Sequence, residues 1–129
     1  MCFEIGVSAD GKVQGVDSNF YCDAGWSLNE VDAIFAAMFG QSCYKIPNCR
    51  FVPFGVRTDT HSHTAVRAPG MVNGAGMMEA IMEHAAAELG LDALDFKLNN
   101  LMEKGDPVMP PPFTLREYHF LFVKNSEMN

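Results

Sequence analysis

The sequence has no long apolar run, no basic tract and little positive charge, and each absence removes a class of protein. No hydrophobic segment approaches the roughly 20 residues that are needed to cross a bilayer, and the first residues do not resemble a secretory signal. Only 9 lysines and arginines stand against 16 aspartates and glutamates, which gives a formal net charge of −7. This balance argues against nucleic acid or an anionic membrane as a partner. We therefore expect an acidic, cytoplasmic protein.

Paired cysteine motifs and a dinucleotide-binding loop are also absent. The four cysteines, Cys2, Cys22, Cys43 and Cys49, include no C-x-x-C pair, so the usual zinc and iron–sulfur spacings are missing. We expect reduced, mostly buried thiols. The glycines of residues 70–76 do not have the G-x-G-x-x-G spacing of a dinucleotide loop.

At 129 residues and 48% hydrophobic composition, the chain is long enough for one core. Alternating apolar residues predict a strand at residues 3–7, and the Asp10-Gly11 turn connects it to a second strand at residues 12–21. A change of phase across Gly15 predicts a bulge there. Another strand at residues 51–56 contains Pro53, which indicates an edge position or a bulge.

Three segments have helical periodicity. The residues Ser27 to Glu30 fit a capping box that opens the first helix, Gly90 ends the second, and Asp92 caps the third. Their predicted apolar faces are Val31, Ile34, Ala37 and Met38 in the first, Met71, Ala75, Met78, Met82, Ala85 and Leu89 in the second, and Leu94, Leu98, Leu101 and Met102 in the third. The pattern predicts an α+β fold in which short antiparallel β elements pack with three amphipathic helices.

The segment between the last strand and the second helix has the composition of an anion-binding bend. Arg67 precedes Pro69, which suits the first turn of a helix because that position needs no N–H donor. Gly70, Gly74 and Gly76 lack a Cβ and permit close approach to the backbone. Free N–H groups at a helix start, together with a guanidinium group, favour an oxyanion, a phosphate or a metal-bound oxygen. Nearby, His61 and His63 stand two positions apart without further ligands, which is more typical of a polar loop than of a metal site.

Three blocks of the sequence resemble the molybdopterin-binding domain of the xanthine dehydrogenase and aldehyde oxidase family. They are Y-K-I-P-N at residues 44–48, T-A-V-R-A-P-G at residues 64–70 and L-N-N-L-M-E-K-G-D at residues 98–106. The R-A-P-G form is most similar to that of insect aldehyde oxidases. On this resemblance we expect residues 1–110 to be part of that larger domain, and residues 111–129 to be a non-family tail, disordered or foreign in origin.

The resemblance also implies roles for individual residues. Arg67, Ala68 and Gly70 match the part of the family motif that lies against the molybdenum cofactor. Pro69 stands where xanthine-type enzymes have a phenylalanine that holds an aromatic substrate, and Phe35 stands where they have a substrate-polarising arginine. A purine would therefore lose a stacking face and a charged partner, which favours less polar aldehydes. Phe35 is alternatively a core residue.

The resemblance further implies two 2Fe–2S clusters and FAD, bound outside this chain, and a homodimer. No residue matches the general-base glutamate of the family, so no catalytic set is complete in this chain. We expect a fragment of a hydroxylase that oxidises aldehydes to carboxylic acids, or hydroxylates N-heterocycles, with water as the oxygen source. The alternatives are a catalytically silent product and a fragment of a xanthine dehydrogenase.

Overall fold

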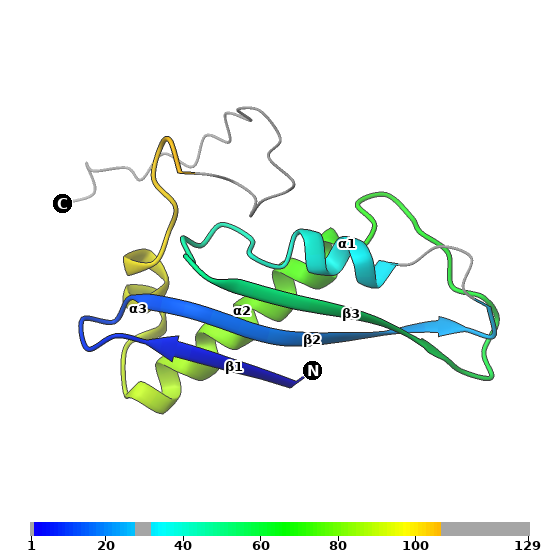
Figure 1. Ribbon diagram of the computed structural model, residues 1–129, viewed down its shortest axis with the longest axis horizontal. Helices are drawn as coiled ribbons and strands as arrows, with labels where there is room; N and C mark the ends of the chain where they lie inside the picture. Colours follow the sequence, from blue (N-terminus) through cyan, green and yellow to red (C-terminus); the bar gives the residue numbers. More distant parts are fainter. Residues whose placement is uncertain (1, 28–31, 107–129) are drawn as a thin grey trace.

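The computed structural model describes residues 2–27 and 32–106, and it has the predicted α+β class with three helices (Figure 1). The elements, in chain order, are β1 (Cys2–Val7), β2 (Val13–Gly25), α1 (Asp32–Met38), β3 (Cys49–Arg57), α2 (Met71–Leu89) and α3 (Ala93–Asn99). The strands form one sheet in the order β1-β2-β3. Among the described residues, no helix is long and apolar enough to span a membrane.

β1 and β2 form the predicted antiparallel hairpin. Gly11 adopts a φ of 77° in the turn, which a residue without a Cβ tolerates, and Ser8 N donates to Lys12 O at 2.9 Å. The pairing shifts between Gly6 and Val7, whose partners are Gly15 and Val13. The extra residue on β2 is therefore next to Gly15, and the predicted irregularity is confirmed.

The expected antiparallel arrangement is wrong for the last strand, because β3 runs parallel to β2. After β2 the chain passes through α1 and returns before β3 begins, and such a crossover is what a parallel pair requires. In the described part of the chain β3 is an edge strand, as Pro53 predicted.

The predicted apolar face of α1 is also wrong. Ala33 and Ala36 are the buried residues of this helix, whereas Ile34 is 47% and Phe35 38% exposed. Val31 and most of the proposed capping box lie outside the described residues, as does the tail after residue 110. The small side chains face inward because the start of α2 packs directly against this side of α1.

The predictions for α2 and α3 hold in part. Met78, Met82 and Ala85 of the predicted stripe are buried, whereas Met71 and Leu89, at its two ends, are exposed. Gly90 ends α2 with a φ of 66°, and Asp92 caps α3 by accepting from Leu94 N at 2.9 Å and Asp95 N at 3.0 Å. In α3 the buried residue is Phe96, while Leu94 and Leu98 of the predicted face are exposed. These leucines lie on the side of a short helix that no other described element covers.

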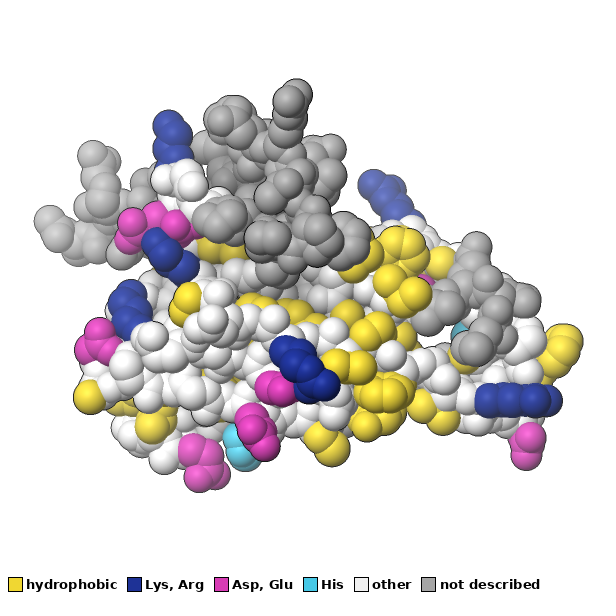
Figure 2. All heavy atoms as spheres, viewed as in Figure 1, with side chains coloured by type: hydrophobic (Ala, Val, Ile, Leu, Met, Phe, Trp, Pro, Cys, Tyr) yellow, Lys and Arg dark blue, Asp and Glu magenta, His cyan; other side chains and the backbone are white. Residues whose placement is uncertain are grey.

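The core lies between the sheet and α2. It is one cluster of buried residues, Val13, Val16, Tyr44, Ile46, Met78, Ile81, Met82, Ala85, Ala86 and Phe96. The outer face of the sheet is open and partly apolar, and hydrophobic side chains gather there (Figure 2). Tyr21 and Phe54 stack on this face with ring centroids 4.8 Å apart.

A hydrogen-bonded group at the edge of the core links Tyr44 to α2 and α3. The Tyr44 hydroxyl donates to Glu79 Oε1 at 2.6 Å, and Lys97 Nζ lies 2.9 Å from Glu79 Oε2 and 2.7 Å from Glu83 Oε1. Partial burial alone would raise the pKa of Glu79, but the hydrogen bonds from Tyr44 and Lys97 outweigh it and hold this pKa below its ordinary value. Burial, together with the bond to Glu79, raises the pKa of Tyr44, which stays a donor.

We expect Tyr44→Phe to lower the free energy of unfolding by about 1–2 kcal/mol near neutral pH, because a hydrogen bond to a carboxylate is lost. Because the pKa of Glu79 is lower in the folded state, its carboxylate stabilises the fold at pH values above the unfolded-state pKa of 4.5. This contribution is lost as the pH falls through the folded-state pKa. The difference between wild type and Tyr44→Phe should therefore narrow in acid. Urea unfolding near neutral pH and at about pH 3.5 measures both effects.

The control for this prediction is Tyr21→Phe. Tyr21 is exposed, and the substituted ring keeps its stacking on Phe54. We expect a change below about 0.5 kcal/mol. A Tyr44→Phe loss of the same size at both pH values would contradict the proposed coupling to Glu79.

Candidate functional site

The segment between β3 and α2 begins with a firm attachment to the end of β2. Its backbone pairs there through three bonds: Thr58 N to Gly25 O at 3.0 Å, Trp26 N to Thr60 O at 2.9 Å and His63 N to Ala24 O at 3.2 Å. Gly25 makes this close contact possible, since a Cβ on it would lie 2.1 Å from His61 O. Residues 57–63, a polar loop by sequence, are thus joined by backbone hydrogen bonds to the end of β2.

The Asp23 side chain adds to this attachment. It accepts from Thr58 Oγ1 at 2.6 Å and from Gly25 N at 2.9 Å. These hydrogen bonds, with His63 nearby, hold the pKa of Asp23 below its ordinary value. The carboxylate is therefore ionised over the physiological pH range, and it links the end of β2 to Thr58.

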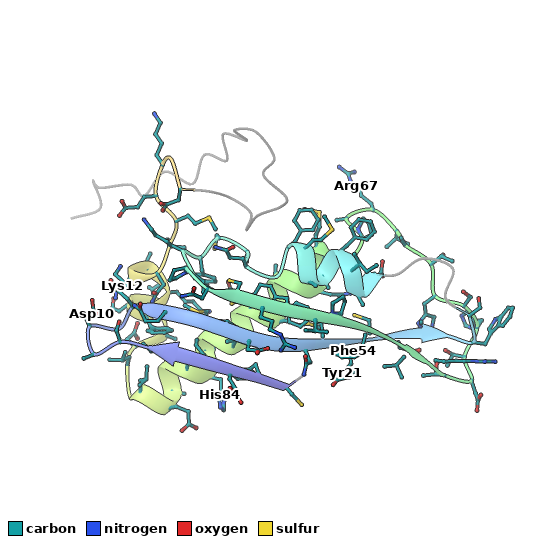
Figure 3. The ribbon with its side chains drawn as sticks, in the orientation of Figure 1. Asp10, Lys12, Tyr21, Phe54, Arg67 and His84 are labelled. Carbon is teal, nitrogen blue, oxygen red and sulfur yellow. The ribbon has the colours of Figure 1, made fainter. Side chains whose placement is uncertain are left out.

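After this attachment the chain rises into the bend at residues 67–70. Arg67 is exposed, and Figure 3 shows its side chain pointing away from the sheet and the helices. None of the described carboxylates pairs with it. The guanidinium group is thus free, within the described chain, to meet an anionic or oxygen-bearing group.

The backbone of the bend is unusual at Ala68. This residue has a φ of 61°, in the left-handed region that non-glycine residues seldom adopt. Gly70, two positions later, has a φ of 65° and is the N-cap of α2, and no side chain caps the helix there. The first turn of α2 contains no acidic residue. No acidic residue of the first turn of α2 therefore offsets the positive end of the helix.

We expect Ala68→Gly to raise the free energy of unfolding by about 0.5–1 kcal/mol, because glycine adopts this φ without the steric cost that alanine bears. Thermal or urea unfolding of the two proteins tests this. The control is Ala9→Gly, since Ala9 is in a turn and is not among the described residues with positive φ. The free energy of unfolding of Ala9→Gly should fall by about 0.5 kcal/mol. A similar fall in Ala68→Gly would show that the backbone at Ala68 is not strained.

The space beside Gly70 and Gly74 is occupied by α1, so an outside group has no room there. A Cβ on Gly70 would lie 2.4 Å from Asp32 O and 2.5 Å from Ala36 N, and a Cβ on Gly74 would lie 2.5 Å from Ala36 O. Gly76 alone of the three glycines has open space around it. The close approach inferred from the sequence therefore occurs, but the approaching group is the backbone of α1.

This packing brings Phe35 to the bend. The Phe35 Cβ lies 2.7 Å from the position of a Cβ on Gly70, and Phe35 is partly exposed rather than in the core. Pro69, next to Gly70 in the chain, is half-buried. The five predicted site residues thus lie at or beside the junction of α1 and α2. None of them lines the cavity at the end of β2 or the one on the outer side of β1 and β2.

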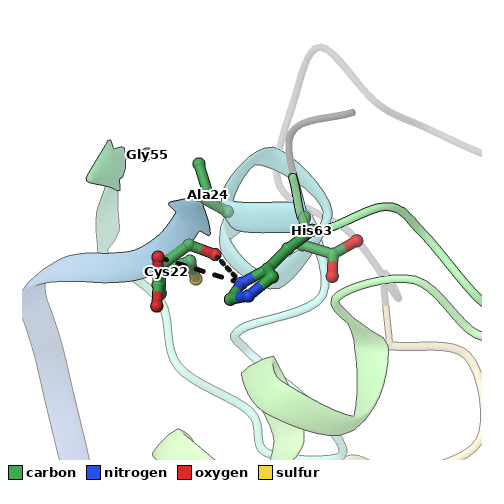
Figure 4. A pocket seen from close by; sticks show the side chains of 7 residues that line it. Cys22, Ala24, Gly55 and His63 are labelled. Atoms are coloured by element: carbon green, nitrogen blue, oxygen red, sulfur yellow. Dashed lines mark hydrogen bonds and ion pairs between the residues drawn. The ribbon is translucent and has the colours of Figure 1, made fainter. Parts of the chain in front are cut away.

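The smaller cavity lies beneath His63, at the end of β2 (Figure 4). It measures about 10 Å³ and is lined by Cys22, Asp23, Ala24, Asp32, Ala33, Gly55 and His63. Burial, followed by the charge of Asp32, raises the pKa of the Cys22 thiol. All four cysteines are free thiols, as predicted, although Cys2 is exposed and the others are only half-buried. In the described residues no group of histidine, cysteine or acidic side chains has a metal-binding arrangement.

The other two motif blocks pair with each other, at a distance from the bend. Tyr44 forms a bridge with Leu101, Lys45 N donates to Asn100 O at 2.8 Å, and Lys45 Nζ lies 2.8 Å from Asp106 Oδ1. These blocks therefore stabilise the fold, and of the three only residues 64–70 form the candidate site. The spacing of the blocks gave no sign of this division.

Comparison with known proteins agrees with this fold. Residues 1–101 match the family model of the molybdopterin cofactor-binding domain. The chain is 32% identical over 106 residues to the xanthine dehydrogenase of Calliphora vicina, and 30% identical over 108 residues to the aldehyde oxidase of Homo sapiens. Each alignment covers 81% of this chain and 8% of the relative. Proteins of both names are thus about equally similar to it.

Among solved structures, the aldehyde oxidoreductase from Desulfovibrio gigas matches with a TM-score of 0.69 and 25% sequence identity. The match covers 81% of this chain and 12% of that chain. The chain therefore spans a small part of the length of the proteins that it matches. Since the family model covers most of its residues, this chain belongs to the molybdopterin cofactor-binding domain family.

Proposed function

We propose that this chain forms one wall of the molybdenum site in a hydroxylase that oxidises aldehydes to carboxylic acids, or hydroxylates N-heterocycles, with water as the oxygen source. The observation that carries this proposal is the bend at residues 67–70, where an exposed arginine without an ion-pair partner among the described residues stands beside an alanine with positive φ, just ahead of α2. The match to the family supports the same assignment.

The residues of the bend fit a molybdenum–molybdopterin group in charge and in exposure. Arg67 offers donors for which no carboxylate of residues 2–27 or 32–106 competes, and Ala68 orients the backbone in a conformation that must be held by its surroundings. Gly70 fixes the bend on α1. Fixed donors of this kind stabilise negative charge without reorganising during the reaction. The cofactor supplies the redox chemistry when it is bound, and the chain supplies position and electrostatic stabilisation.

The neighbouring side chains favour a substrate of low polarity. Phe35 exposes apolar surface beside the bend, and Pro69 adds a rigid apolar group. Neither residue can pair with the polar edge of a purine. We propose that an aldehyde, or a weakly polar heterocycle, is preferred over xanthine.

The remaining parts of the proposed enzyme lie outside this chain. They are the general-base glutamate, two 2Fe–2S clusters, FAD and the second subunit of a homodimer, and a cytoplasmic location stays a prediction of the sequence. The relatives are about twelve times longer than the matched segment, which covers 8% of their length. The chain is therefore proposed to act only together with such parts.

A chimera tests the proposed function in a complete enzyme. Residues 1–101 replace the matching segment of the human aldehyde oxidase, and molybdenum content, aldehyde turnover and inhibition by purines are measured. We expect about one molybdenum per chain, aldehyde turnover and weak purine inhibition. Phe35→Arg together with Pro69→Phe should strengthen purine inhibition by roughly tenfold or more, because a charged partner and a stacking face return.

Ile34→Arg is the matched control for this experiment. Ile34 is exposed next to Phe35 and carries no proposed contact with the substrate, so its substitution should leave purine inhibition unchanged. Equal gains from Ile34→Arg and from the double variant would refute the pocket. A chimera that binds molybdenum and prefers purines would instead favour a xanthine dehydrogenase.

A catalytically silent chain is the second candidate, because no position of these 129 residues matches the general-base glutamate that the family resemblance implies. On either proposal the purified 129-residue chain should hold no molybdenum and reduce no dye with aldehydes. Molybdenum at about one per chain, with aldehyde-dependent dye reduction, would exclude the silent chain.

A further inference from the structure

We propose that His63 is a positioning residue that holds the Arg67 bend in place by binding the end of β2. The inference concerns the bend itself, and its catalytic meaning rests on the function proposed above. It gives a role to a side chain for which the sequence indicated only a polar loop.

The His63 imidazole is held by contacts on both of its nitrogen atoms. Nδ1 lies 3.1 Å from the backbone oxygen of Asp23, and since a carbonyl can only accept, Nδ1 carries the proton. Nε2 lies 3.3 Å from Thr60 Oγ1. Figure 4 shows the ring reaching over the small cavity toward β2, and its Nδ1 is 3.8 Å from Asp23 Oδ1.

These contacts matter for the bend because His63 lies shortly ahead of it in the chain. It is the last residue of the segment that pairs with β2, through His63 N and Ala24 O. Further along the chain, Gly70 packs against α1. Between His63 and Gly70, Val66 is 78% exposed and Arg67 is exposed. The bend thus lies between the segment that pairs with β2 and the packed start of α2, and His63 adds a side-chain contact to that pairing.

The two attachments are also close to each other in the fold. Asp32 lines the cavity beneath His63, and the backbone oxygen of the same residue is the atom nearest to a Cβ on Gly70. Loss of the His63 side-chain contact therefore weakens one end of this segment, while its other end stays packed on α1. Local opening should increase at residues 64–69 without global unfolding.

Limited trypsin cleavage of the 129-residue chain tests the inference, because Arg67 is itself a cleavage site. His63→Ala should accelerate cleavage after Arg67 roughly three- to fivefold, as expected for the loss of one exposed hydrogen bond. Cleavage after Arg50, within β3, reports global unfolding and should stay within about twofold. His63→Asn should restore the wild-type rate, because the Asn Nδ2 takes the place of His Nδ1 and donates to the same carbonyl.

His61→Ala is the control, since His61 is exposed and its ring only touches that of His63, with centroids 5.9 Å apart. It should leave both cleavage rates unchanged. Unchanged cleavage after Arg67 in His63→Ala, acceleration of the same size in His61→Ala, or failure of His63→Asn to restore protection would each overturn the proposal. If His63→Ala is also cut faster after Arg50, His63→Leu replaces it, since its side chain fills comparable space but has no group that can donate to Asp23 O.

The chimera separates this inference from the proposed function. If His63→Ala lowers kcat for aldehydes and His63→Asn restores it, both are supported. If the cleavage pattern is as expected but kcat and KM do not change, the positioning role of His63 stands and the assignment of the bend to the molybdenum site fails.

Discussion

Gly74→Ala is expected to lower the free energy of unfolding by about 2–4 kcal/mol, although alanine is the better helix former. The added Cβ would lie 2.5 Å from Ala36 O and 3.3 Å from Ala36 C and Cα. These are backbone atoms of α1, which cannot move out of the way by a change of rotamer. The two helices must therefore separate, and the contacts of Ala33 and Ala36 loosen with them.

Gly76→Ala is the matched control, two positions along the same helix. A Cβ on Gly76 meets nothing within 4 Å, and the residue is exposed. Alanine there should raise the free energy of unfolding by about 0.5–1 kcal/mol, the ordinary gain at an exposed helical position. The same substitution is thus expected to lower the free energy of unfolding at Gly74 and to raise it at Gly76.

Urea unfolding followed by the helical circular dichroism signal measures both variants. The midpoint of Gly74→Ala should fall, that of Gly76→Ala should rise, and the slope should change little for either. If Gly74→Ala is as stable as Gly76→Ala, the contact between α1 and α2 is not as close as the structure has it. The position of Phe35 beside Gly70 would then also be in doubt.

The strands and helices themselves could be predicted from the sequence because each follows from local chemistry. The alternation at residues 3–7, the Asp10-Gly11 turn, the Asp92 cap and the Gly90 stop all act within a few residues along the chain. Each of them is found in the structure. Features that depend on distant partners were not predictable in this way.

The inner face of α1 is the clearest example. Helical periodicity predicted Ile34 on the buried face, but Ala33 and Ala36 are buried instead, and the backbone of Ala36 lies directly against Gly70 and Gly74. Periodicity indicates that a helix has an apolar face, whereas the packing partner decides which of two apolar faces is buried. Phe35 is then exposed beside the site.

The candidate site was predictable in composition but not in shape. Arg67, Pro69 and Gly70 identify a bend ahead of a helix, but nothing in the sequence indicates the positive φ of Ala68. The roles of His63 and Asp23 were missed because their contact spans 40 positions. The pairing of the first and third motif blocks was missed for the same reason, since they lie more than 50 positions apart in the chain.

Asn100 lies in the third of these blocks, and Asn100→Ala is expected to lower the free energy of unfolding by about 2–4 kcal/mol. The side chain is 2% exposed. Its Oδ1 accepts from Val13 N at 2.8 Å, and its Nδ2 donates to Gly11 O and Phe96 O, both at 2.9 Å. Truncation would leave one N–H and two carbonyl groups without these partners at the junction of the hairpin and α3.

Asn99→Ala is the control, because Asn99 is adjacent and bonds to the same turn, through Nδ2 to Asp10 O at 3.2 Å and Gly11 O at 3.3 Å. These bonds are exposed, so water replaces them and the loss should stay below about 1 kcal/mol. Equal losses from Asn99→Ala and Asn100→Ala would show that burial does not set the cost.

Asn100→Asp tests the direction of the same hydrogen bonds. The carboxylate keeps the acceptor for Val13 N but turns a second oxygen toward the oxygens of Gly11 and Phe96, so it should be at least as destabilising as alanine near neutral pH. Repulsion and burial would raise the folded-state pKa of this new acid above its unfolded value of about 3.9, and stability should be partly recovered as the pH falls through the folded-state value. Urea unfolding at several pH values between about 7 and 4 measures this recovery. If the stability of Asn100→Asp instead falls in acid in parallel with that of the wild type, the assigned donor role of Nδ2 is contradicted.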